Sequence, residues 1–419
     1  MYRKTVLPNG AAIVTERVEH MRSVSLSIWV NAGSRDETER ENGISHLIEH
    51  MIFKGTRTRD SLMIAKELDA IGGLSNAFTG KENTCFHARV LDKHFDRLAD
   101  ILADIFLNSR FDPEDLDRER QVILQEINMV EDTPDENIHT LFNRSFWRNH
   151  PIGMPILGTS DTVTAIDREA IFRYMERNYV PERILVVAAG LVDHEKTVSF
   201  FGPLFERMQP GSGAWERSSP RSHFGVQAHE KSLEQVHVCL GVSAPSMTDR
   251  DRFPCALFNT ILGGNMSSRL FQEVRENRGL AYSVYSFLTA YTDVGVLGIC
   301  MATDREKVNP ALEVVNTVVQ AIRKGEVTET DLEEAREHLI GGIYLSSESS
   351  DNLMMRLAKN EFAFGEYVSL EELVENLEKT SLDEVIDMAR RVFHGDEVSL
   401  TTLGPFSEGD VDRQWLHFA

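Results

Sequence analysis

The sequence predicts an α+β protein built from two tandem homologous units, each a mostly antiparallel sheet packed with helices. The chain has 419 residues, which is too long for one compact core. A run of alternating polar and apolar residues, typical of a half-buried strand, starts at Ser23 and recurs at Gln235. Similar helical and strand-like segments follow both runs in the same order. We therefore interpret the chain as a single duplicated unit.

The two halves correspond element by element. Each half continues from its first strand (23–34 and 235–246) through a polar loop into an apolar helix that ends in glycine (44–55 and 254–264). Strand-like segments follow at 74–90 and 281–302, and amphipathic helices follow at 92–106 and 304–322 and then at 113–132 and 328–347. A Gly/Pro/Ser-rich stretch separates the halves. The predicted domains are residues 1–207 and 224–419, joined by a linker at 208–223.

Composition favours a cytoplasmic globular protein. The hydrophobic fraction is 42%, and the longest apolar run, Ile184–Val192, is far too short to span a membrane. The first ten residues contain no apolar segment of the kind that signal peptides have. The four cysteines are scattered in apolar runs without a CxxC pair, so we expect reduced core thiols rather than disulfides or metal ligands.

The charge balance argues against nucleic-acid binding. There are 66 acidic and 44 basic residues, giving a formal net charge of −22, whereas nucleic-acid-binding surfaces are basic. Many acids cluster in 34–42 and 128–137. The charge fits a merely soluble protein, or acidic surfaces that attract basic ligands.

One apolar helix carries an unusual polar cluster. His46, Glu49 and His50 fall within five residues that otherwise read as the buried face of a helix. Residues four apart lie on the same face, so the two imidazoles can aim at one point, which suits Zn²⁺ if a third ligand comes from elsewhere. The aligned positions of the second half are about Phe258 and Leu262, ordinary core residues. This departure of one repeat from the other indicates a site.

The helix predicted at 113–132 supplies candidate carboxylates. Glu119 and Glu126 are seven residues apart and therefore share a face, and the apolar residues Val122, Ile123 and Val130 are placed on the same side. Carboxylates buried on such a face need a cation or hydrogen-bond donors. Glu126 aligns near Gly342 in the second half, so this carboxylate also belongs to one repeat only.

Together these residues carry a resemblance to a known family. The string HLIEHMIFKGT, followed at a distance by Glu126, resembles the pitrilysin-type metallopeptidases, the inverzincins, and is most similar to the mitochondrial-processing-peptidase branch and its bacterial relatives. The resemblance covers essentially the whole chain, because that family's metallohydrolase fold is this duplicated unit. It implies a zinc-dependent endopeptidase that hydrolyses unfolded or short peptides.

The resemblance also implies roles for individual residues. His46, His50 and Glu126 would hold one zinc per chain, Glu49 would be the general base acting on zinc-bound water, and Glu119 would support a ligand. Asn76, Ala77 and Phe78 would form an edge strand that pairs with the substrate backbone. In the second half, Arg275 and Tyr282 would hold the substrate carbonyl and stabilise the oxyanion. The loop at Gly263–Gly264 has too few glycines to match the family's glycine-rich lid, and a helix stop explains it better.

Two alternatives remain at this point. Some relatives have lost the zinc site and act as scaffold subunits of a respiratory complex or as the inactive half of a heterodimer, but here every motif residue is present. With only two units in the chain, we expect a homodimer that encloses extended, basic peptides in a chamber. The alternative is a heterodimer with an inactive homologue.

Overall fold

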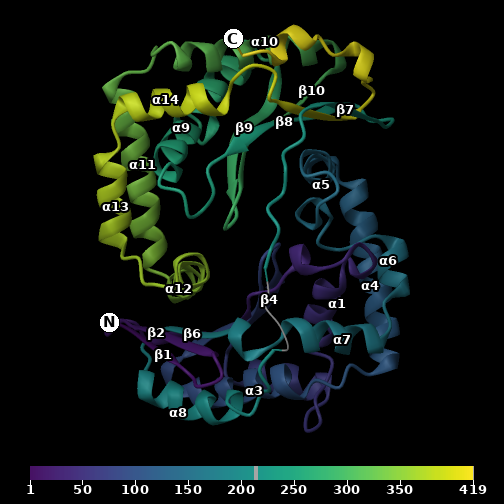
Figure 1. Ribbon diagram of the computed structural model, residues 1–419, viewed down its shortest axis with the longest axis vertical. Coiled ribbons are helices and arrows are strands. Elements are labelled where there is room, and N and C mark those ends of the chain that lie inside the picture. Colours follow the sequence, from purple (N-terminus) through teal and green to yellow (C-terminus); the bar gives the residue numbers. More distant parts are fainter. Residues whose placement is uncertain (212–215, 419) are drawn as a thin grey trace. The chain divides into compact units, whose positions relative to one another are not determined.

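The computed structural model describes residues 1–211 and 216–418, and it forms two compact units (Figure 1). The first unit comprises Met1–Met129, Met154–Arg217 and Ser346–Tyr367, and the second comprises Val130–Gly153, Ser218–Leu345 and Val368–Ala419. Residues 212–215, in the middle of the predicted linker, lie outside the described residues. Within the described part of the chain, no helix is long and apolar enough to cross a membrane.

The first unit is built on a six-stranded sheet of order β1-β2-β6-β3-β5-β4. Its strands are β1 (Tyr2–Val6), β2 (Ala12–Arg17), β3 (Ser23–Val30), β4 (Leu74–Thr79), β5 (Thr84–Leu91) and β6 (Ile184–Gly190). Every pair is antiparallel except β2 with β6. The apolar run noted in the sequence becomes β6, which is buried along its whole length. Because β4 is the last strand in the order, one side of its backbone is open in the described part of the sheet.

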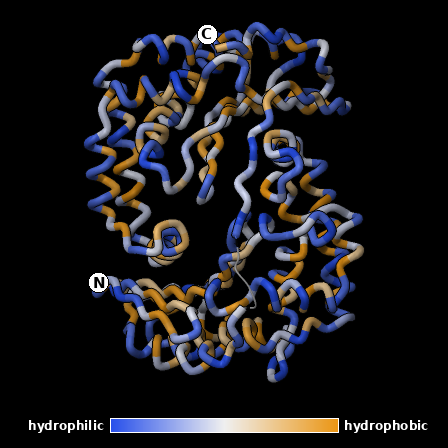
Figure 2. Tube along the Cα trace, viewed as in Figure 1, coloured by the Kyte–Doolittle hydropathy of each residue, from blue (hydrophilic) through white to orange (hydrophobic). Residues whose placement is uncertain are grey.

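Helices of the first unit cover its sheet. They are α1 (Ile44–Met51), α2 (Ser61–Ala70), α3 (Phe95–Asn108), α4 (Pro113–Asp132), α6 (Ser160–Ala165), α7 (Arg168–Asn178), α8 (His194–Phe205) and α12 (Ser350–Phe364). The large core cluster joins the sheet to α1, α3, α4, α7 and α8. Figure 2 shows hydrophobic residues alternating with hydrophilic ones along the helices, as expected when one stripe of each helix faces a core.

The second unit repeats this plan with a five-stranded sheet of order β7-β11-β8-β10-β9. Its strands are β7 (Gly225–Glu230), β8 (Val236–Ala244), β9 (Ala281–Ala290), β10 (Gly295–Thr303) and β11 (Ser399–Gly404), and only β7 and β11 run parallel. Its helices are α5 (Pro134–Phe146), α9 (Arg252–Gly263), α10 (Val308–Arg323), α11 (Glu329–Ser347), α13 (Leu370–Lys379) and α14 (Leu382–Val392). The predicted fold class, two sheets with helices in two tandem units, is confirmed.

Each half of the sequence gives one helix to the unit built mainly from the other half. From the second half, α12 packs with Leu353, Met354 and Leu357 against Trp29 and its neighbours on the sheet of the first unit. From the first half, α5 packs against β8, β10 and β11 of the second unit. The predicted boundaries at 207 and 224 follow the repeat in the sequence, whereas the compact units exchange these helices because each sheet has a second apolar face to cover.

We expect Leu357→Ala to lower the free energy of unfolding by about 2–5 kcal/mol, because a buried leucine leaves a cavity when truncated. Leu357 is 1% exposed on α12, where its side chain packs on the first unit's sheet. Urea unfolding followed by circular dichroism measures the change. Leu345→Ala is the matched control, since Leu345 is 73% exposed, and a similar loss in both variants would contradict this packing.

Candidate metal centre

The helix that carries the two histidines is fixed at its N-terminus by a buried carboxylate. Glu37 is 2% exposed and accepts hydrogen bonds from the backbone N–H of Gly43 (2.8 Å) and Ser45 (2.9 Å) and from Asn42 Nδ2 (3.0 Å). Burial raises the pKa of Glu37 to about 7, against the opposing effect of these donors. Gly43 has φ 97°, and a Cβ there would lie 2.7 Å from the Leu157 carbonyl oxygen, so the helix start requires glycine.

Three side chains from α1 and α4 converge on one point. His46 Nε2 and His50 Nε2 lie 3.8 and 3.7 Å from Glu126 Oε2, and the two rings are 4.6 Å apart between centroids. The two histidines are one helical turn apart on α1, and Glu126 reaches them from α4. The structure therefore brings together the three residues that the sequence proposed as ligands.

Each imidazole directs its Nε2 toward Glu126, at the point where a metal would bind. His50 Nδ1 lies 3.1 Å from Glu119 Oε2, so an N–H group at Nδ1 would donate a hydrogen bond to that carboxylate. Burial, reinforced by the neighbouring His50, lowers the pKa of His46 to about 3, so its imidazole is neutral at pH 7. His46 Nδ1 is buried without a hydrogen-bond partner among the described residues.

The donor set fits a zinc ion. Two ligand atoms each about 2.0–2.1 Å from a tetrahedral zinc lie about 3.4 Å apart, and the Nε2–Oε2 separations here are only a few tenths of an ångström wider. Two imidazoles and one carboxylate are ligands that zinc accepts, and three protein ligands are typical of a catalytic zinc.

Glu119 contacts His50 on its Nδ1 side, away from the point on which the three ligands converge. Its side chain is buried, with one carboxylate oxygen 3.1 Å from His50 Nδ1 and the other 2.6 Å from Lys54 Nζ. The carboxylate thus orients His50, and the ammonium group of Lys54 compensates its charge. The sequence did not single out Lys54, although it lies one turn after His50. The buried stripe of α4 is narrower than expected, since Ile123 is fully buried but Val122 is 39% exposed.

Glu49 lies beside the histidines and contacts the sheet. Thr79 Oγ1 donates a hydrogen bond of 2.6 Å to Glu49 Oε2, and Thr79 is the last residue of the edge strand β4. Burial raises the pKa of Glu49, although the bond from Thr79 opposes that effect. A carboxylate of raised proton affinity next to the ligands is suited to accept a proton.

The predicted strand residues lie on β4. Asn76 is exposed, while Ala77 and Phe78 are half-buried, and the Ala77 N–H donates to Asn76 Oδ1 (2.9 Å). Phe78 packs its ring on Trp29 at 5.4 Å. The strand therefore has one open backbone edge and is anchored by an aromatic contact, and its role in binding substrate stays a prediction.

Arg275 and Tyr282 lie together in the second unit. The Arg275 guanidinium is 4.7 Å from the centroid of the Tyr282 ring, and both residues line an open pocket of about 410 Å³. Tyr282 is 79% exposed, so it is a surface aromatic rather than a core one. Their proposed action on the substrate carbonyl stays a prediction.

In the same unit α9 ends at Gly263, in agreement with a helix stop at Gly263–Gly264.

We expect Glu119→Ala to weaken zinc binding by about 10–100-fold, because residues that orient a metal-ligating histidine typically contribute that much. Competition with a chromogenic chelator measures the dissociation constant. Glu114→Ala, in the exposed first turn of the same helix, is the control. Unchanged affinity in Glu119→Ala would show that the His50–Glu119 contact does not support the site.

Comparisons with known proteins agree with the geometry. Residues 12–160 match the family described as insulinase (peptidase family M16), and residues 165–339 match the peptidase M16 inactive domain. The chain is 37% identical over 398 residues to the uncharacterized zinc protease YmxG of Bacillus subtilis, covering 94% of this chain and 97% of that protein. It is 39% identical over 425 residues to an uncharacterized zinc protease of Streptomyces coelicolor, covering 100% of this chain and 92% of that one.

Solved structures share the fold. A protease from Helicobacter pylori superposes with a TM-score of 0.90 at 20% identity, covering 97% of this chain and 99% of that one. A peptidase M16 inactive domain from Pseudomonas fluorescens superposes with a TM-score of 0.90 at 19% identity, covering 96% of this chain and 98% of that one. With relatives above 30% identity over nearly its full length, the chain belongs to peptidase family M16, a family of zinc proteases.

Proposed function

We propose that this protein is a zinc endopeptidase that cleaves short or unfolded peptides in extended conformation. The observation that carries the proposal is the convergence of His46, His50 and Glu126, with Glu49 beside them and hydrogen-bonded to the open-edged strand β4. A ligand set, a proton acceptor and a strand able to bind peptide backbone thus occur within one unit. A scaffold that had lost catalysis would not need this combination.

Each residue has a distinct part in the proposed reaction. A zinc ion held by the three ligands would polarise the scissile carbonyl and lower the pKa of a water molecule. Glu49 would accept a proton from the attacking water and pass it to the leaving amine, while Thr79 holds the carboxylate in position. Glu119 keeps His50 oriented with Nε2 toward the site.

The substrate backbone would add to β4 as a further strand. Backbone pairing at Asn76–Phe78 binds any extended segment, so affinity depends little on side-chain identity. Folded proteins would resist, because they do not offer a free extended strand. Arg275 and Tyr282 are proposed to bind the substrate carbonyl from the second unit.

We expect the working protein to be a cytoplasmic homodimer with one catalytic zinc per chain, and a heterodimer with an inactive homologue is the alternative. A two-unit chain would need a partner to enclose a peptide, and both sets of proposed catalytic residues are present in this one chain. All four cysteines are free thiols, as is usual in a reducing compartment.

Glu49→Gln should retain zinc and lose about 10²–10⁴-fold in turnover, because a positioned proton acceptor commonly contributes that factor. Turnover is measured on a quenched fluorescent peptide, and zinc by atomic absorption on the same sample. His50→Ala should lose both zinc and activity, whereas the exposed Glu378→Gln on α13 should change neither. Near-normal turnover in Glu49→Gln would exclude Glu49 as the base.

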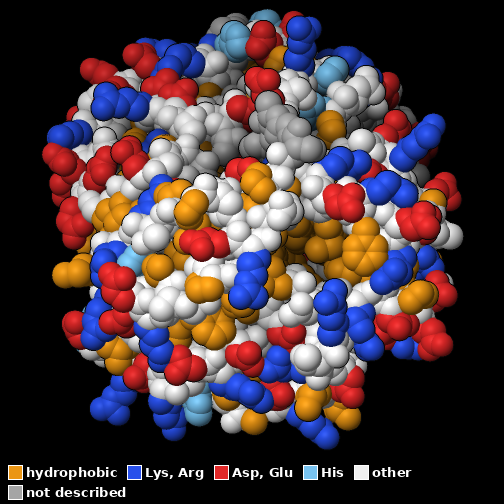
Figure 3. All heavy atoms as spheres, turned by 60° about the horizontal axis from the view of Figure 1, so that its bottom comes forward, with side chains coloured by type: hydrophobic (Ala, Val, Ile, Leu, Met, Phe, Trp, Pro, Cys, Tyr) orange, Lys and Arg blue, Asp and Glu red, His pale blue; other side chains and the backbone are white. Residues whose placement is uncertain are grey.

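The acidic stretches contribute unequally to a preference for basic peptides. In 34–42, Glu37 caps α1, Asp36 accepts a hydrogen bond from Arg217 (2.8 Å) and Glu41 accepts one from Arg177 (2.7 Å), so these three acids stabilise the fold. All four acids of 128–137 are exposed. On the face drawn in Figure 3, acidic and basic side chains are interspersed. A charge preference would therefore depend on the second stretch and the net charge of −22.

We expect peptides rich in Arg or Lys to be cleaved with higher kcat/KM than acidic peptides of equal length. The difference should shrink as salt rises, because the screening length falls to about 8 Å at physiological ionic strength. Matched peptide pairs assayed at low and high salt measure it. Equal rates at low salt would exclude the charge preference and leave the zinc site unaffected.

A further inference from the structure

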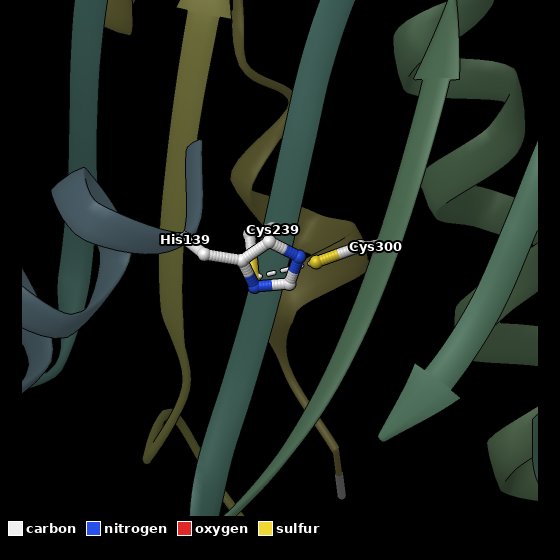
Figure 4. Close-up of side chains that lie close together, drawn as sticks. All are labelled: His139, Cys239 and Cys300. Carbon is white, nitrogen blue, oxygen red and sulfur yellow. Dashed lines mark hydrogen bonds between the residues drawn. The ribbon is translucent and has the colours of Figure 1, made fainter. Parts of the chain in front are cut away.

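Two of the four cysteines face each other on neighbouring strands of the second unit. Cys239 on β8 and Cys300 on β10 are directly opposed in the antiparallel register, so their side chains lie on the same face of the sheet. Helix α5 covers that face, and its residues Ile138 and Phe142 belong to the same buried cluster as both cysteines. Figure 4 shows the imidazole of His139, also from α5, beside the two sulfurs.

The three side chains form a compact donor set. The two sulfurs are 2.9 Å apart, and one ligand atom from each of the three residues lies within 4.8 Å of the others. Even carbon atoms in non-bonded contact prefer about 3.5–4.0 Å, and a disulfide would require about 2.05 Å. Both cysteines are free and buried, as expected for reduced core thiols, and their sulfurs lie in direct contact.

The surroundings favour a thiolate on Cys300 alone, because burial and the neighbouring Cys300 raise the pKa of Cys239 well above its ordinary value. Burial acts to raise the pKa of Cys300, but hydrogen bonds from Cys239 and His139 outweigh it and lower the pKa to about 6. Cys239 is fully buried and Cys300 is 3% exposed, whereas His139 is half-buried and its Nε2 lies 2.8 Å from the Tyr285 hydroxyl. Tyr285 is 38% exposed, so the cluster is close to solvent on this side.

We propose that His139, Cys239 and Cys300 form a second metal site, which takes a thiophilic divalent cation such as Zn²⁺. Two thiolates and one imidazole are the donors that zinc selects over harder cations, and the fourth position would be open toward Tyr285. Zn–S bonds of about 2.3 Å place two sulfurs about 3.8 Å apart in a tetrahedral site, so binding needs only small rotations of both cysteines.

A metal held by this cluster would connect a helix to the sheet that the helix covers. Helix α5 comes from the first half of the sequence. It contacts the second unit's sheet through apolar packing, through a hydrogen bond between His237 Nδ1 and Asp135 Oδ1 (2.9 Å), and through the contact of His139 Nε2 with the Tyr285 hydroxyl (2.8 Å). A cation shared by His139 and the two strand cysteines would tie this helix to β8 and β10. The site is independent of catalysis, and it would add a second metal to the one zinc expected per chain.

Cobalt(II) distinguishes this site from the catalytic one, because only a thiolate ligand gives an intense sulfur-to-cobalt charge-transfer absorption. We would titrate the full-length, fully reduced His50→Ala protein with Co²⁺. A charge-transfer band that saturates at one equivalent per chain is expected, and it should be absent in the double variant His50→Ala/Cys300→Ser. Cys255→Ser in the same background is the matched control, since Cys255 is buried in the same unit outside the cluster.

Two further measurements keep the test decisive if Cys300→Ser folds poorly. His139→Phe keeps both thiols and should weaken cobalt binding by at least about tenfold, as expected for loss of one ligand of three. Added Zn²⁺ should raise the melting temperature of His50→Ala but not of His50→Ala/His139→Phe. Absence of the band in reduced His50→Ala, its persistence without Cys300, or a Cys239–Cys300 disulfide that forms in place of metal binding would overturn the proposal.

Discussion

The buried contact between α1 and α4 constrains the first unit more than any other interaction. Two imidazoles and two carboxylates lie between helices whose other facing residues are apolar, and leaving such groups unpaired would be costly. They pair with one another: Glu119 with His50 and Lys54, and Glu126 with both imidazoles. Both Nε2 atoms point toward Glu126 Oε2, where a cation would bind between them, whereas His46 Nδ1, the other nitrogen of its ring, has no hydrogen-bond partner among the described residues.

That cluster depends on a second buried charge at the start of α1. An eight-residue helix is too short to be stable by itself, and Glu37 supplies acceptors for two of its free N–H groups. The direction of α1, and hence of both imidazoles, follows from this cap and from the close approach of Gly43 to Leu157. A residue nine positions before the first ligand therefore helps to position the site.

The sequence predicted the elements that repeat, and it did not predict the contacts between distant segments. The helix at 113–132 and the strands near 74–90 appear where periodicity placed them, because local patterning determines them. The aligned core residues Phe258 and Leu262 are indeed fully buried. Glu37 looked like one of several surface acids, and nothing in local periodicity indicates that α5 and α12 each cover the other half's sheet.

The same limit explains why Cys239 and Cys300 were interpreted as ordinary core thiols. Each lies in an apolar strand, and only the register between β8 and β10 places the two opposite each other. The third member comes from a helix a hundred residues earlier in the chain, so no spacing motif joins them. The two proposed metals would then have different ligands. Two imidazoles and a carboxylate would hold the catalytic metal in the first unit, and two thiolates and an imidazole would hold the other metal in the second unit. Total metal content alone would count both sites together, and the sulfur ligands provide the spectroscopic means to separate them.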